Sequence, residues 1–222
     1  MNPRILITGS SSGIGAACAR HFAAAGWEVL GTSRRGGAWI ACDLATEAGI
    51  AAAAAAVAAD SRPLEALVLS AGEFLAASIE RTPPEEFERI WRITVWARHA
   101  LTRALLPQLT PPAGAPARAV IHISSLAAHR DFPDETAYTS AMHAAIGLAR
   151  AQDSELRARG IRAAVVSPGM VRTPLTERAF GAAALAGALE PEAIAASVSR
   201  LVGVIRSGGY IPEILHVPQN SM

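Results

Sequence analysis

The feature that most constrains this chain is a glycine-rich turn placed between a strand and a helix near its start. Residues 4–8 are mostly β-branched and apolar, which predicts a buried strand. The turn at 9–15 follows, and residues 16–25 then show the pattern of a helix before a second strand at 28–32. A strand, a turn, a helix and a strand within about 30 residues form a βαβ unit. The sequence therefore predicts an α/β fold.

The three glycines of the turn have separate tasks. Gly9 permits a tight turn off the strand, Gly13 lets the backbone approach a pyrophosphate, and Gly15 lets the helix pack closely on the sheet. The first turn of the helix offers free N–H groups and the positive end of a dipole to phosphates. A plain turn is the alternative, but the strand before it and the helix after it favour a nucleotide site. The residues predicted to cradle the phosphates are Gly9, Ser11, Ser12, Gly13, Ile14 and Gly15.

The end of the second strand bears on which nucleotide binds. An NAD site usually has an acidic residue about 20 residues after the glycines, and here that neighbourhood reads Ser33-Arg34-Arg35. A guanidinium suits a 2′-phosphate through its charge and its forked donors. Ser33 and Arg34 are therefore predicted to favour NADP(H) over NAD(H). The alternative is that Arg34 and Arg35 only form a solvated turn.

Strands and helices alternate along the rest of the chain. Further strands are predicted at 39–41, 66–69, 120–123, 162–166 and 214–217, and helices at 46–59, 83–108, 136–159 and 191–206. This alternation is typical of one doubly wound, mainly parallel sheet with helices on both faces. We expect a single domain over residues 1–222, with a mobile substrate lid rich in small residues at about 173–189.

Composition and charge exclude several other classes of protein. A net charge of +1 gives no electrostatic case for a nucleic-acid partner. The longest apolar run, 50–59, is mostly alanine and too short to span a membrane. No signal peptide is expected before the first strand, and the two cysteines suit a reduced, cytoplasmic chain. The histidines have no metal-ligand spacing, so no metal site is predicted.

The stretch from 120 to 142 carries the candidate chemistry. A predicted strand ends at Ser124 and Ser125, and Tyr138 falls in the first turn of the next helix. Hydroxyl groups in these places can meet in the crevice where open α/β sheets bind ligands. The alternative is that the serines cap a loop and the tyrosine only packs. His129 lies in the loop between them and is a candidate to contact the substrate and exchange protons with it, although a loop histidine is more often a surface residue.

Together these motifs resemble the short-chain dehydrogenases/reductases, the SDR family, over nearly the whole chain. Ser125 lies 13 residues before Tyr138, as the family's catalytic serine and tyrosine do, and the resemblance implies these roles here. It also implies a seven-stranded Rossmann-fold sheet, a small-molecule substrate, and a homodimer or homotetramer, with a hetero-oligomer of two SDR subunits also open. The remaining residues that the resemblance places around the cofactor are Asp43, Leu44, Ser70, Ala71, Gly72, Pro168, Gly169, Val171 and Thr173.

Three positions depart from the family pattern. The family's tyrosine is followed four residues later by a lysine on the same face of the helix, and here that residue is Met142. The asparagine of the preceding long helix is replaced by Thr94, and that of the family's Asn-Ala-Gly segment by Ser70. In the family the lysine contacts the nicotinamide ribose and lowers the pKa of the tyrosine, and the helical asparagine supports a water that relays protons to the lysine.

Three functions are open on the sequence alone. The first is an NADP(H)-dependent reductase of a small carbonyl substrate, in which Tyr138 donates the proton and Ser125 assists. Loss of the lysine harms alcohol oxidation more than reduction, because oxidation needs the phenolate, which a phenol of pKa about 10 rarely forms near neutral pH. The second is a non-redox isomerase, dehydratase or cyclase on the same fold. The third is a catalytically dead subunit that binds a cofactor or a partner.

Overall fold

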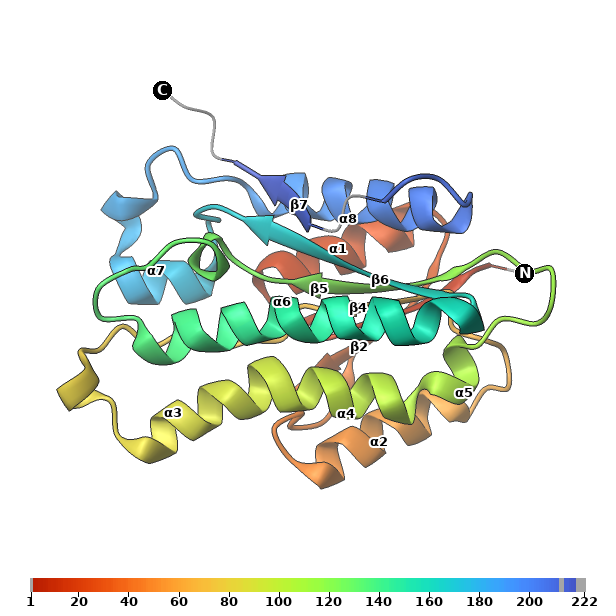
Figure 1. Ribbon diagram of the computed structural model, residues 1–222, viewed down its shortest axis with the longest axis horizontal. Coiled ribbons are helices and arrows are strands. Elements are labelled where there is room, and N and C mark those ends of the chain that lie inside the picture. The colour runs from red at the N-terminus through yellow and green to blue at the C-terminus, as the bar shows by residue number, and fades with distance from the viewer. Residues whose placement is uncertain (1, 212–213, 219–222) are drawn as a thin grey trace.

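Seven strands form one sheet in the order β3-β2-β1-β4-β5-β6-β7 (Figure 1). The computed structural model describes residues 2–211 and 214–218. Each strand runs parallel to its neighbours. The expected doubly wound sheet is thereby confirmed, and it is parallel throughout. The strands are β1 (Arg4–Ile7), β2 (Glu28–Ser33), β3 (Ile40–Ala41), β4 (Ala66–Leu69), β5 (Arg118–Ile123), β6 (Ile161–Pro168) and β7 (Ile214–Val217).

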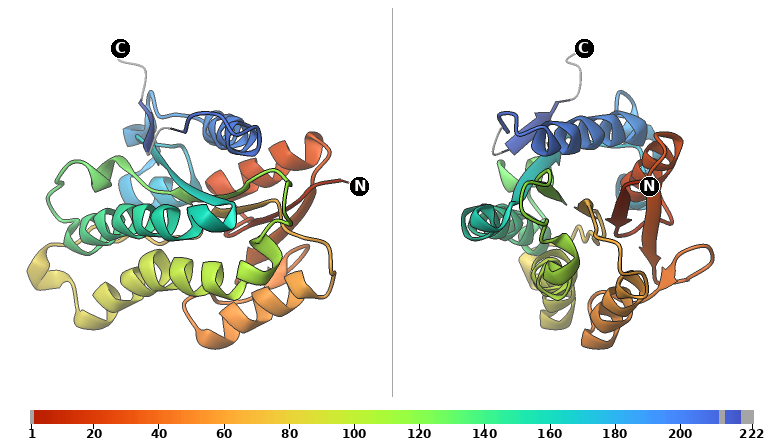
Figure 2. Two further views of the ribbon diagram at one scale, coloured as in Figure 1. Left: turned by 45° about the vertical axis from the view of Figure 1, so that its right-hand side comes forward. Right: turned by 90° about the vertical axis from the view of Figure 1, so that its right-hand side faces the viewer.

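Helices cover both faces of the sheet, as the end-on view in Figure 2 shows. α1 and α8 pack on one face, while α2, α4 and α6 pack on the other. The helices are α1 (Gly13–Ala24), α2 (Glu47–Ala58), α3 (Pro84–Trp91), α4 (Ala97–Ala104), α5 (Leu106–Leu109), α6 (Thr136–Leu156), α7 (Pro174–Phe180) and α8 (Pro191–Arg206). Short turns are η1 (Ile79–Arg81), the π-helical η2 (Arg92–Trp96), η3 (Leu126–Ala128), η4 (Arg157–Arg159) and η5 (Ala182–Leu185).

The core is divided into two layers because successive side chains of a strand point to opposite faces. In β1, Ile5 and Ile7 pack in the layer of α1 and α8, whereas Leu6 packs in the layer of α2 and α4. All three side chains are fully buried. A central parallel strand therefore has to be apolar on both faces, which is why these strands appear in the sequence as continuous apolar runs.

Two predicted segments differ in detail from the structure. The helical region expected at 83–108 is divided into α3, the π-helical turn η2, α4 and α5. The segment at 173–189, expected to be a mobile lid, contains α7, whose start is stabilised by a capping box between Thr173 and Thr176. Whether this segment moves over a substrate stays a prediction.

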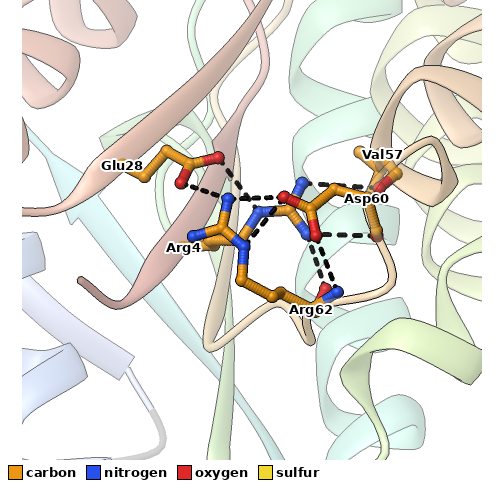
Figure 3. A network of polar contacts seen from close by, with 5 residues as sticks. All are labelled: Arg4, Glu28, Val57, Asp60 and Arg62. Atoms are coloured by element: carbon orange, nitrogen blue, oxygen red, sulfur yellow. Dashed lines mark hydrogen bonds and ion pairs between the residues drawn. The ribbon is translucent and has the colours of Figure 1, made fainter. Parts of the chain in front are cut away.

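The amino-terminal edge of the sheet is held by a network of charged side chains (Figure 3). Arg4 is 2% exposed, and its guanidinium donates to the Glu28 carboxylate at 3.2 Å and to the Arg62 carbonyl at 2.5 Å. Arg62 in turn donates to Glu28 at 2.6 Å and to Asp60. A buried guanidinium is tolerated when its donors are paired in this way. The network ties β1, β2 and the loop after α2 together at the edge opposite the crevice.

Candidate active site

The site is built at the carboxyl edge of the sheet, where the loop after β1 meets the start of α1. A Cβ atom at Gly15 would lie 2.3 Å from the Gly9 carbonyl oxygen, so only glycine fits there. Gly9 itself has a φ of +71°, which glycine adopts without strain. The Ser12 side chain at the N-cap of α1 makes no capping hydrogen bond. The N–H groups of the first turn are therefore left for an anion such as a phosphate.

A cavity of about 430 Å³ opens around this turn. Most of the residues predicted to bind the cofactor line it, together with several that sequence reasoning missed. The predicted residues in its wall are Gly9, Ser11, Ser12, Gly13, Ile14, Gly15, Ser33, Arg34, Asp43, Leu44, Ser70, Ala71, Gly72 and Thr173. The missed ones are Thr32, Cys42, Ala45, Glu73, Phe74, Arg89, Ile93, Leu175 and Arg178. Loops after β1, β2, β3 and β4 thus converge on one space, as the order of the strands requires.

An ion-pair cluster borders the part of the cavity near β2. The Arg34 guanidinium donates to the Glu73 carboxylate at 2.7 Å, and Arg89 pairs with the other carboxylate oxygen. The side chain of Glu73 is 16% exposed and that of Arg34 is 67% exposed. Arg34 can therefore turn toward an anion in the cavity at little cost. Glu73 directly follows the Ser70-Ala71-Gly72 segment, and that position was the signal that could have found it.

The predicted catalytic pair lies at the next strand along, beyond the lining of this cavity. Ser125 follows β5, and its hydroxyl accepts a hydrogen bond from the Ala127 N–H at 3.2 Å. Tyr138 lies in the first turn of α6 and is partly buried. Burial raises the pKa of the Tyr138 phenol, whereas a hydrogen bond from the Ser125 hydroxyl and the charge of Arg98 lower it. The net shift is upward, so the phenol is protonated at neutral pH and can donate a proton.

One turn further along α6, Met142 stands where the family resemblance implies a lysine. Its side chain is 4% exposed and packs with Ala128, Ile146 and Val165. The Ser124 hydroxyl points to its sulfur at 3.9 Å. The chain has 20 basic residues, and all of them are arginine. A lysine amino group therefore cannot reach Tyr138 from any part of the sequence.

A cation does lie near Tyr138, and it comes from α4. Arg98 is 3% exposed and donates to the carbonyl of Ile123, the last residue of β5, at 2.8 Å. Burial lowers the pKa of Arg98 to about 10, and the neighbouring Tyr138 phenol raises it. Arg98 is thus charged at neutral pH. Its position four residues after Thr94, on a buried helix face, is the signal in the sequence that could have found it.

Other buried polar groups surround Arg98. Thr94, in the π-helical turn, is fully buried, and its hydroxyl has no hydrogen-bond partner among the described residues. His122 on β5 is fully buried and its Nε2 pairs with the Gln152 side chain on α6 at 2.9 Å. Burial and the Arg98 charge lower the pKa of His122 to about 3. His122 is therefore neutral, and Arg98 provides the positive charge of this cluster.

One aromatic side chain packs on Tyr138 and a second packs on the first. The Phe74 ring meets the Tyr138 ring edge-on, with 4.8 Å between their centroids. The Phe180 ring, at the end of α7, lies 5.1 Å from Phe74. Figure 1 shows α7 at the same end of the sheet as the start of α6. These contacts connect the predicted lid to the predicted proton donor, which periodicity in the sequence could not reveal.

Four other predicted site residues lie outside the cavity lining. His129 pairs with the Ser167 hydroxyl at 3.0 Å, and its ring packs on that of His216, 4.5 Å away. The three remaining residues hold the segment after β6. The Gly169 N–H donates to the Val217 carbonyl, and Val171 forms a β-bridge with Leu189. The predicted residues in this group are His129, Pro168, Gly169 and Val171.

The described residues were also compared with the requirements of a metal site and of a membrane-spanning helix. Within residues 2–211 and 214–218, no group of three or more histidine, cysteine, aspartate or glutamate side chains could hold a metal ion. No helix in these ranges is both long enough and apolar enough to cross a membrane.

Comparison with known proteins agrees with this architecture. The family model for short chain dehydrogenases matches residues 3–183. The chain is 31% identical to the 3-oxoacyl-(acyl-carrier-protein) reductase MabA of Mycobacterium avium, over 84% of this chain and 73% of that one. It is 30% identical to the serine 3-dehydrogenase of Rhizobium radiobacter, over 79% and 75%. A 3-ketoacyl-(acyl-carrier-protein) reductase from Brucella melitensis, solved in complex with NADH, is similar with a TM-score of 0.88 at 25% identity, covering 98% of this chain and 97% of that one.

Proposed function

Because this chain belongs to the short-chain dehydrogenase family, we propose that it is an NADPH-dependent reductase that converts a small carbonyl compound into an alcohol. The observation that carries this proposal is the pairing of Ser125 with Tyr138, whose partly buried phenol is protonated at neutral pH. A protonated phenol suits reduction, which consumes a proton at the carbonyl oxygen. Alcohol oxidation would need the phenolate instead.

The cavity suits the pyrophosphate and the adjoining nucleotide of a nicotinamide dinucleotide. The close contact at Gly15 and the uncapped start of α1 form a cradle for the pyrophosphate. Arg34 borders the same cavity and would hold the 2′-phosphate that distinguishes NADPH from NADH. The similar reductase from Brucella melitensis was solved with NADH, which supports a nicotinamide cofactor. The preference for NADPH rests on Arg34 and on the absence of an acidic side chain among residues 33–35.

The side chains of this chain then have distinct tasks in reduction. A bound nicotinamide cofactor, held at the cavity around Gly9 to Gly15, would supply the hydride for the carbonyl carbon. The Ser125 hydroxyl donates a hydrogen bond to the carbonyl oxygen and polarises it, and Tyr138 gives the same oxygen its proton. The edge-on contact with the Phe74 ring helps to hold the Tyr138 ring in place. We propose that α7 and the residues up to 189 close over the substrate, with Phe180 against Phe74.

A non-redox reaction on the same fold is the second candidate. The burial of Met142 among apolar side chains favours it, because the lysine that Met142 replaces would contact the ribose of the cofactor. An isomerase, dehydratase or cyclase could use Ser125 and Tyr138 for proton transfer alone. An inactive subunit would need neither side chain.

Isotope transfer distinguishes these functions. We expect the protein, incubated with NADPH deuterated on either face of C4 and with a panel of small ketones and aldehydes, to place deuterium on the carbon of an alcohol. The Tyr138→Phe variant should lose this activity by roughly 10²–10⁴-fold while binding NADPH with unchanged affinity. If NADPH binds and neither label is transferred to any of the substrates, the proposed reductase activity is wrong. If Tyr138→Phe transfers deuterium at the wild-type rate, Tyr138 is not the proton donor.

A further inference from the structure

A buried polar cluster lies between α4, β5 and α6, and the η2 turn that leads into α4 packs on the first turns of α6, where Tyr138 lies. Arg98 is at its centre, with Thr94 on the same helix face, His122 on β5 and Gln152 on α6. All of these side chains are at least nine-tenths buried. A guanidinium at this depth is costly unless its charge interacts with something. A negatively charged group is therefore expected near Arg98.

No carboxylate provides that partner within the described residues. Arg98 makes no ion pair there, and its one hydrogen bond goes to the Ile123 carbonyl. Its Nε and Nη1 atoms are buried without hydrogen-bond partners. The group whose ionisation responds to Arg98 in the favourable sense is Tyr138, whereas His122 is held neutral. Arg98 is thus a cation without a permanent anion, hydrogen-bonded to the end of β5 two residues before Ser125, and the Tyr138 phenol that its charge acts on becomes an anion when it gives up its proton.

We propose that Arg98 is a positioning residue that supplies, from α4, the positive charge that stabilises the ionised form of Tyr138. The proposal rests on the proposed function only in naming the reaction that ionises the phenol. When the carbonyl oxygen is protonated, the phenolic O–H bond breaks, a new O–H bond forms on the product, and the phenolate faces the Arg98 guanidinium. A proton from water then restores the phenol. The positive charge would thus come from α4, whereas the lysine that the family resemblance implies would lie on α6, at the position of Met142.

The other charged groups around Tyr138 do not replace Arg98 in this role. Glu135, at the N-cap of α6, raises the pKa of the phenol and so opposes ionisation. His122 is neutral, and its ring pairs with the Gln152 side chain. Ser125 contributes a hydrogen bond without a charge. Ser125 and Arg98 are therefore the two groups that favour ionisation of Tyr138, and Arg98 is the one that does so with a charge.

The test uses the fact that the chain has two tyrosines. The other, Tyr210, is 90% exposed, so Tyr210→Phe leaves Tyr138 as the sole tyrosine. Incorporation of 3-fluorotyrosine into this background gives one ¹⁹F resonance and lowers the pKa of the phenol toward a pH range where the fold survives. A pH titration of that resonance then reports the pKa of Tyr138 without substrate or cofactor.

We expect Arg98→Gln, which retains a donor for the Ile123 carbonyl, to raise the pKa of Tyr138 by at least about one unit. That is a tenfold smaller ionisation constant. Arg98→Lys should stay close to the parent value. In the double variant with Arg98→Gln and Met142→Lys, the charge returns from α6 and the pKa should fall again. Arg98→Met is the second neutral variant if the glutamine variant does not fold.

The matched control is Arg118→Gln. Arg118 is also a buried arginine, 4% exposed, but it lies at the opposite end of β5 and pairs with Glu65. Its replacement should leave the Tyr138 titration unchanged. The proposal is overturned if the neutral Arg98 variants titrate like the parent, or if Arg118→Gln shifts the pKa as much as they do. If the neutral Arg98 variants raise the pKa of Tyr138 but no deuterium is transferred to any substrate, the role of Arg98 is upheld and the proposed reductase activity is refuted.

Discussion

The two halves of the crevice are specified in different ways. In the half around the loops after β1, β2 and β4, the requirement falls mainly on the backbone: Gly15 has to lack a Cβ, and Gly9 has to adopt a positive φ. In the half around β5 and the start of α6, the requirement is for a proton donor and a charge near it. A backbone requirement allows only glycine at certain positions with a fixed spacing, so it can be recognised in the sequence. A charge can be supplied from any helix that reaches the site, as Arg98 shows.

The largest effect should come from filling the contact at Gly15. Gly15→Val places side-chain atoms against the Gly9 carbonyl, which a Cβ alone would meet at 2.3 Å. We expect the free energy of unfolding to fall by about 3 kcal/mol or more and NADPH binding to weaken at least ~100-fold. Denaturant unfolding and fluorescence titration measure these changes. Gly147→Ala in α6 is the control, because a Cβ there meets nothing within 4 Å. Normal NADPH binding by Gly15→Val would show that this half is not limited by its backbone.

An intermediate effect should appear on acidification, in the other half. Because the folded chain holds the pKa of His122 at about 3, the unfolded chain binds more protons below about pH 6.5. Stability that is fully present above that pH is therefore lost as the pH falls. We expect the free energy of unfolding to drop by roughly 2 kcal/mol more in the wild type than in His122→Gln between pH 6.5 and pH 5.

Urea unfolding at several pH values measures this difference. The control is the same pair of proteins at pH 8, where an imidazole is neutral in both the folded and the unfolded chain, so the difference between them should not change further as the pH rises. Parallel pH profiles for the two proteins would mean that the cluster around Arg98 is not as closed to water as its burial indicates.

The smallest effect should concern the choice of cofactor. Arg34→Ser removes the guanidinium that lines the cavity, and we expect the ratio of NADH to NADPH dissociation constants to fall about five- to tenfold. Arg35→Ser is the matched control, since Arg35 is the next residue and does not line the cavity. Equal changes in both variants would assign the effect to the overall charge of the turn. No change in either would remove the basis for an NADPH preference.

The same contrast explains how much could be predicted from the sequence. The sheet followed from alternating strands and helices, and the glycine spacing placed the loop after β1 correctly. Ser125 and Tyr138 came from their spacing, and the structure brings them together. Arg98, Glu73 and Phe74 could not be found in that way, because their partners lie on other elements. His129 was predicted from its place in a loop. In the structure its ring pairs with Ser167 and packs on His216, and its contact with a substrate stays a prediction.

The helix α7 was not predicted, although its start could be recognised in the sequence. The small residues after 180 favoured a mobile segment, but Thr173, Pro174 and Thr176 carry the signals of a helix start. The capping box is formed by side chains three residues apart, so it was visible in the sequence. The many small residues of 173–189 favoured a mobile segment, whereas the capping box of Thr173 and Thr176 marks the start of the helix that the structure contains.

The charged network of Arg4, Glu28 and Arg62 has a consequence for how this chain can diversify. It fastens the sheet at the edge that carries none of the predicted site residues. Loops at the other edge can then lengthen, shorten or exchange side chains without loosening the strands that support them. A sheet that is held at one edge and carries its site at the other tolerates the replacement of catalytic residues. Its substrate can therefore change during evolution while the strands stay the same.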